Sequence, residues 1–91
     1  MNDKKYRIKP GFILREIAGE SFAVPVSAEN GSSDIVILNP VSKLLWVNLQ
    51  DEKTIDELVA VVRSQFEVDP ETAKNDITDF IIELENNGFL V

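Results

Sequence analysis

The pattern of apolar and polar residues divides the chain near residue 39. Before it, three short runs rich in β-branched and aromatic residues predict strands over 12–18, 21–26 and 34–38. After it, apolar residues recur at the three- and four-residue spacing that is typical of helices. The predicted order is therefore three strands followed by three helices.

Turn-forming residues separate the predicted strands. Gly19-Glu20 is a turn signal between the first two runs, which therefore form a hairpin. Pro25 cannot donate a ladder hydrogen bond, so it belongs near a strand end, a bulge or a free edge. Residues 27–33 have the composition of a loop, and Asn30-Gly31 within them favours positive φ.

Each predicted helix has a start signal in the sequence. Asn39-Pro40 and Asp69-Pro70 both place a capping residue before a proline, which suits the first helical position. Thr54 and Glu57 have the spacing of a capping box, and Gly88 matches the glycine that follows many helices. The predicted helices cover 40–49, the stretch from Thr54 to Phe66, and 70–87.

This segregation of strands and helices predicts the α+β class, with helices covering one face of a three-stranded antiparallel sheet. Ninety-one residues, of which 44% are hydrophobic, are enough for one domain with its own core. The polar segment 1–11 is expected to be a tail, and 12–91 the domain. The apolar end, Phe89-Leu90-Val91, is expected to pack back onto it.

The composition excludes several kinds of chemistry. The chain has no cysteine and no histidine, so it has no thiol nucleophile, no thiolate zinc site and no imidazole base. Asp76, Asp79 and Glu83 are expected on a wet helix face, where carboxylates are poor general acids at neutral pH. No EF-hand spacing, glycine-rich phosphate loop, signal peptide or membrane-spanning run is present. We therefore expect a cytoplasmic protein that is not an enzyme and needs no cofactor or metal.

The net charge of −7 lies entirely in the helical part. Residues 1–38 contain five basic and five acidic side chains, whereas residues 39–91 contain four and eleven. This excess is consistent with a solvated helix surface, and also with a surface that repels nucleic acid and favours a basic or neutral partner.

The third strand has two unusual features. Ile35, Val36, Ile37 and Leu38 are all apolar, although successive residues of a strand point to opposite faces. One face can pack on helices, and the other either is covered by the protein's own tail and helices or contacts a partner. The strand is also an edge without charge after Asp34, and natural proteins normally protect such edges. This edge is therefore suited to accept an extended peptide by β-augmentation.

An ordered set of short motifs runs through the chain: Leu38-Asn39, Leu45-Trp46, Thr54-Ile55-Asp56-Glu57-Leu58, Phe66-Glu67-Val68-Asp69-Pro70-Glu71 and Leu84-Glu85-Asn86-Asn87-Gly88-Phe89-Leu90. Through these motifs, the stretch from Pro10 to Val91 resembles the PqqD-like family of peptide chaperones, the stand-alone form of the RiPP recognition element. The chain departs from the usual family pattern at Pro40-Val41, where small residues are common, and at residues 51–53, where a glycine is common.

The resemblance implies a winged-helix-like module that binds the leader of a ribosomally made precursor peptide. In it, the leader lies antiparallel to the third strand, in a cleft walled by the third helix, and is presented to a modifying enzyme that is often a radical SAM protein. Carried over to this chain, the strand side of the site is Ile35, Val36, Ile37 and Leu38, and the helix side is Ile77, Phe80, Ile81 and Leu84.

Each of these helix residues is equally consistent with an ordinary core position. Ile81 lies at the margin of the apolar stripe and is the first choice for peptide contact, whereas Trp46 and Phe66 are assigned to the core.

Two other functions fit parts of the pattern. A winged-helix regulator would use the third helix to bind DNA, but that helix carries Glu71, Asp76, Asp79, Glu83 and Glu85 against Lys74 alone. A homo-oligomerising domain would pair the third strand with its own copy, and the sequence does not separate this hypothesis from peptide binding.

Overall fold

The computed structural model describes residues 4–26 and 35–91 of the chain. Three strands come first: β1 (Phe12–Ile17), β2 (Glu20–Pro25) and β3 (Val36–Leu38). Three helices follow: α1 (Pro40–Asn48), α2 (Ile55–Gln65) and α3 (Pro70–Asn86). The predicted α+β order is confirmed. The predicted loop 27–33 with Asn30-Gly31, and Asp34 of the third predicted strand, lie outside the described residues.

The strands form an antiparallel sheet in the order β1-β2-β3, so β1 and β3 are its two edges. Ala18 and Gly19 make the turn of the hairpin, and both have positive φ, 53° and 82°. This backbone geometry matches the right-handed twist of the flanking strands. Pro25 is the last residue of β2, where it was expected, and pairs with Phe12.

The three predicted helix starts are confirmed by their hydrogen bonds. Asn39 accepts from the Ser42 N–H at 2.8 Å, and Asp69 accepts from the Thr72 N–H at 3.1 Å. Thr54 and Glu57 form the complete capping box at the start of α2. In the described part of the chain, no helix is both long enough and apolar enough to cross a membrane.

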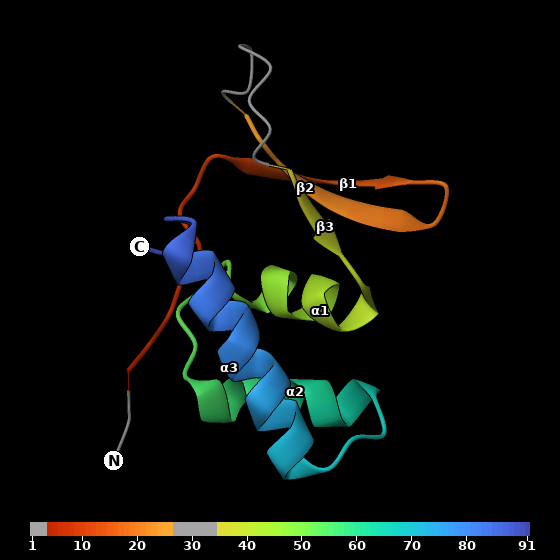
Figure 1. Cartoon of the computed structure of the whole chain (residues 1–91), viewed down its shortest axis with the longest axis vertical. Helices are drawn as coiled ribbons and strands as arrows, with labels where there is room; N and C mark the ends of the chain where they lie inside the picture. Colours follow the sequence, from red (N-terminus) through yellow and green to blue (C-terminus); the bar gives the residue numbers. More distant parts are fainter. Residues whose placement is uncertain (1–3, 27–34) are drawn as a thin grey trace.

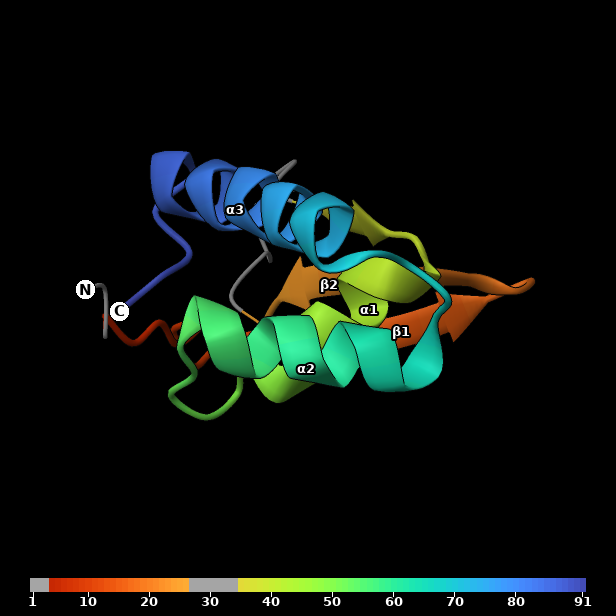
Figure 2. The ribbon, with the colours of Figure 1, turned by 90° about the horizontal axis from the view of Figure 1, so that it is seen from below.

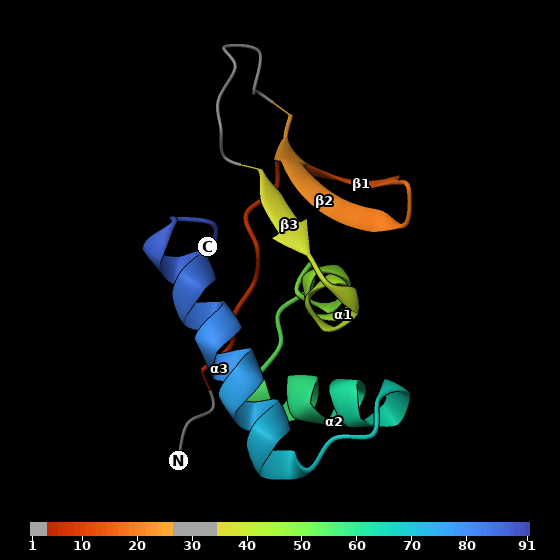
Figure 3. The same ribbon diagram turned by 45° about the vertical axis from the view of Figure 1, so that its right-hand side comes forward.

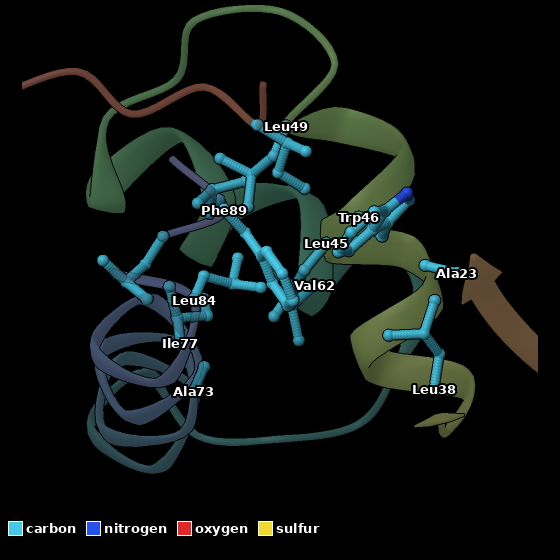
Figure 4. Packing of buried hydrophobic residues seen from close by; sticks show 13 residues of the cluster. Ala23, Leu38, Leu45, Trp46, Leu49, Val62, Ala73, Ile77, Leu84 and Phe89 are labelled. Carbon is cyan, nitrogen blue, oxygen red and sulfur yellow. The ribbon is translucent and has the colours of Figure 1, made fainter. Parts of the chain in front are cut away.

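The helices lie on one face of the sheet. Figure 1 shows α1 between the sheet and α2, with α3 running beside both helices. Seen from below in Figure 2, α2 and α3 lie in front and the sheet behind. Buried side chains from the two layers meet in one core, where Ala23 and Leu38 of the sheet approach Trp46 of α1 (Figure 4). Phe12 joins the sheet to this core through edge-to-face contacts with Trp46 and Phe89.

The N-terminal segment differs from the tail that its polar composition suggests. Residues 6–9, the N-terminal strap, are bound to the helical part by backbone hydrogen bonds. Tyr6 pairs with Lys53, and the Ile8 N–H donates to the Leu49 carbonyl at 2.9 Å. Ile8 is only 3% exposed and belongs to the core cluster. A single buried residue among charged neighbours has no periodicity, so the sequence pattern gives no sign of this packing.

We expect Ile8→Ala to destabilise the fold by about 2–5 kcal/mol, the usual cost of truncating a buried isoleucine. Urea unfolding would measure the change. Ile13→Ala removes the same atoms from a side chain on the outer sheet face that is 44% exposed, and it should cost well under half as much. Equal costs for the two variants would mean that the strap does not hold its buried position in solution.

The cap of α3 predicts an acid-dependent loss of stability. The Thr72 hydroxyl and N–H donate to Asp69 and lower the pKa of this carboxyl below its usual value. The ionised form therefore contributes stability that is fully present above the unfolded pKa and is lost as pH falls through the folded pKa.

Asp69→Asn keeps a capping oxygen but does not titrate, so its urea midpoint should fall less than that of the wild type on acidification. Asp51→Asn removes a carboxylate from a turn and serves as the control. If the urea midpoints of the Asp69 and Asp51 variants both fell with pH as much as that of the wild type, the cap would not be a source of the acid dependence.

Candidate functional site

The free edge of β3 is the starting point of the site. β2 pairs with one side of β3, and no described element pairs with the other. Val36 lies opposite Ala23, which is fully buried, so Val36 points to the helix side of the sheet. Ile37 points to the opposite side and is 73% exposed. The backbone N–H and C=O groups along this edge can form hydrogen bonds with an added strand.

A cleft separates the edge of β3 from the C-terminal half of α3, and we call it the β3–α3 cleft. Figure 3 shows the strand and the helix on either side of it. Its volume is about 340 Å³. On one side it is lined by Ile35, Val36 and Ile37, and on the other by Glu83, Leu84, Asn87 and Phe89. An extended peptide that pairs with β3 would place alternate side chains in this cleft.

A second cavity continues along the same helix, and we call it the α1–α3 groove. It has a volume of about 490 Å³ and lies where the N-terminal end of α1 faces α3. Glu83 lines both cavities, so the groove and the cleft adjoin each other along α3. Its lining is Asn39, Pro40, Val41, Ser42, Leu45, Phe66, Asp76, Asp79, Phe80 and Glu83.

The outer face of the sheet is apolar and is covered by no described element. Ile35 and Ile37 on it are 52% and 73% exposed, and Ile13 and Ile17 of β1 are exposed as well. A shallow cavity of about 450 Å³ lies on this face, lined by Arg15, Ile17, Phe22, Val24, Ile35 and Ile37. Within the described residues, the second apolar face of β3 is therefore open to a partner.

The structure separates the eight residues proposed from the sequence. Ile35, Val36, Ile37 and Leu84 line the β3–α3 cleft, and Phe80 lines the α1–α3 groove. Three others are buried in the core: Leu38, Ile77 and Ile81 are 4%, 0% and 3% exposed and line neither cavity. The role of each in peptide binding remains a prediction.

Sequence reasoning did not assign Phe89, Asn87 or Glu83 to the cleft. Phe89 reaches it because Gly88, with φ of 74°, reverses the chain after α3. The Phe89 N–H then donates to the Leu84 carbonyl at 2.9 Å, and the Lys9 N–H donates to the Phe89 carbonyl at 2.8 Å. The expectation that the apolar end packs back is confirmed for Phe89 and Leu90, whereas Val91 is 75% exposed. The strap also holds Phe89 at the cleft through the Lys9 hydrogen bond, and the sequence pattern did not reveal the strap.

The titratable side chains of the described residues with resolved interactions serve the fold. The described residues contain no group of three or more acidic side chains that could hold a metal ion. The two carboxyls with a lowered pKa, Glu57 and Asp69, cap helices α2 and α3, and hydrogen bonds from Thr54 and Thr72 are the first causes. Glu16 accepts hydrogen bonds from Ser21 and Lys43. None of these groups lines the β3–α3 cleft, whose polar lining side chains are Glu83 and Asn87 beside the apolar Leu84 and Phe89.

Comparisons with known proteins agree with this geometry. The model of the family described as coenzyme PQQ synthesis protein D (PqqD) matches residues 26–90. The match includes β3 and all three helices, and thus both walls of the cleft. A search of curated protein sequences finds no match.

Two solved structures share the fold over nearly the whole chain. The first is TbiB1 in complex with the TbiA(beta) leader peptide, with a TM-score of 0.71 and 24% identity, covering 92% of this chain and 93% of that one. The second is lasso peptide synthetase B1 complexed with the leader peptide, with a TM-score of 0.74 and 18% identity, covering 97% of this chain and 99% of that one. Both matches cover more of the chain than the family model, whose match begins at residue 26.

Proposed function

We propose a function for this chain from the premise that it belongs to the PqqD family. The chain is a non-catalytic adaptor that binds the leader of a ribosomally made precursor peptide. The leader adds as a strand to the free edge of β3, antiparallel to it, and is presented to an enzyme that modifies the precursor. The family resemblance favours a radical SAM protein as that enzyme, and the cytoplasm as the compartment.

The observation that carries this proposal is the free edge of β3 beside a cleft that has apolar side chains on both of its sides. Main-chain hydrogen bonds to the edge would supply affinity that does not depend on the peptide sequence. Val36, Leu84 and Phe89 in the cleft would then select the side chains that point inward. The two similar solved structures, which hold leader peptides, support this use of the fold.

The proposed pairing also predicts which peptide side chains face the cleft and which face outward. A strand paired with β3 alternates its side chains, so every second residue would enter the cleft. The residues between them would lie beside Ile35 and Ile37 and extend the apolar outer face of the sheet. The leader should therefore contain a short segment in which the inward positions are apolar.

DNA binding is disfavoured by the charge on α3. Asp76, Asp79 and Glu83 line the groove along this helix and would face a phosphate backbone. A gel shift at low salt would reveal such binding if it occurred.

Self-pairing through β3 would use the same edge as the leader. Sedimentation with and without peptide tests it, because a dimer that the peptide dissociates would show competition for one edge.

The leader of a short precursor encoded beside this chain should perturb the amides of residues 35–38 and of the second half of α3 in an NMR titration. N-methylation of alternate peptide residues makes the test specific for strand addition. Methylation of the alternate residues whose N–H groups face β3 removes the hydrogen-bond donors and should abolish binding. Methylation of the residues between them, whose N–H groups point away from β3, should be tolerated. Perturbations confined to β1 or to the strap would contradict the proposal.

Val36→Asp should weaken binding at least about tenfold, because it places a charge in the cleft beside the apolar side chains of Leu84 and Phe89. Ile17→Asp is the matched control, since it introduces the same charge on the far edge strand, on the outer face. Circular dichroism would establish that both variants are folded, and calorimetry would measure their affinities. Equal losses for the two variants would place the binding site elsewhere.

A further inference from the structure

We propose that the leader carries a basic flank next to the segment that pairs with β3, and that the α1–α3 groove binds this flank. This inference rests on the proposed function and names the class of peptide that the site selects. Lysine or arginine side chains would place their aliphatic parts on the apolar surface of the groove and their cationic groups at Asp76, Asp79 and Glu83.

The groove has two chemically different kinds of lining. Val41, Leu45, Phe66 and Phe80 supply apolar surface, and three carboxylates come from α3, the helix that also carries Phe80. Asp76, Asp79 and Glu83 follow one another at spacings of three and four residues, so they form one row along the helix. A long side chain with an apolar stem and a cationic end matches both kinds of lining.

The row of carboxylates has the length of a short extended segment. Seven residues of helix rise about 10 Å, which three extended residues also span. Two peptide residues that point to the same side lie about 7 Å apart, so two basic side chains in alternate positions fit within the row. The groove therefore favours a short basic stretch over one isolated charge.

The groove also lies on the path of a peptide that follows β3. Asn39 and Pro40 come directly after Leu38, the last residue of the strand, and both line the groove. Glu83 connects the groove to the β3–α3 cleft. A peptide antiparallel to β3 would reach this groove with the residues that precede its paired segment.

The charge in the groove is not balanced from within the described chain. No basic residue lines it, and Lys43, on the same helix as Val41, forms an ion pair with Glu16 of β1. Among the described residues, the ion pairs formed by lysine engage Glu16 and Glu85, and neither belongs to the row. Like charges at this helical spacing repel one another, so a bound cation would relieve the repulsion. The negative field would also steer a basic peptide toward the site.

Panning a display library of fully randomised linear peptides on the intact folded chain tests this inference without knowledge of the natural leader. Three baits are compared: the wild type, the double variant Asp76→Lys/Asp79→Lys, and the control Asp51→Lys/Glu67→Lys. The control makes the same change in net charge at exposed positions that line neither the cleft nor the groove. Circular dichroism of all three baits establishes that they are folded.

The wild type and the control should both enrich peptides that combine an apolar segment with lysine or arginine on its N-terminal flank. The groove variant should enrich aspartate or glutamate at that flank. The best wild-type peptide should bind the groove variant about tenfold or more weakly than it binds the control. Its affinity for the wild type should also fall with added salt.

The outcomes separate this inference from the function on which it rests. In one outcome, all three baits select the same peptides without charge enrichment, and those peptides still perturb the amides of residues 36–38. That result would contradict the basic flank and would support strand addition to β3. If the selected peptides leave those amides unperturbed, strand addition fails and the inference fails with it.

Discussion

Three buried side chains of α3, those of Ile77, Ile81 and Leu84, fix this helix within the core and thereby keep it from closing on β3. Full burial of such a side chain contributes about 1.5–3 kcal/mol, so moving the helix toward the strand would sacrifice several kcal/mol. A helix also cannot replace the missing neighbour of an edge strand, because its own backbone groups are already paired within it. The cleft therefore persists beside an edge that only another extended segment can complete.

The features that the sequence predicts well are those set by local rules. The caps at Asn39, Thr54 and Asp69 involve residues three apart, and each is visible as a short motif. The alternation in the strands and the stripes in the helices likewise depend on one element at a time. Such rules were sufficient for the α+β order and for the identification of β3 as an edge strand.

The less predictable features involve segments that are distant in the chain. Ile8 belongs to the core and pairs with Leu49 and Leu90, which are distant in the sequence, and no local pattern marks it. The apolar stripe of α3 indicates which face is buried, but it does not show where the core ends and the cleft begins. Leu84 and Ile81 are both buried, yet only Leu84 lines the cleft. The cleft is also defined by Phe89 and β3, which lie outside the stripe of α3.

The pairing between the two ends of the described chain has a consequence for synthesis on the ribosome. Ile8 bridges to Leu90, and the Val91 N–H donates to the Arg7 carbonyl at 2.8 Å. The strap emerges before Leu49, Lys53 and residues 89–91, with which it pairs, so β1–β2 can pair early while Ile8 stays exposed. The cleft wall at Phe89 can form only after this later segment has emerged, and the Phe89 carbonyl then accepts from the Lys9 N–H. A nascent chain that still holds residues 89–91 in the ribosome would thus lack this wall of the cleft.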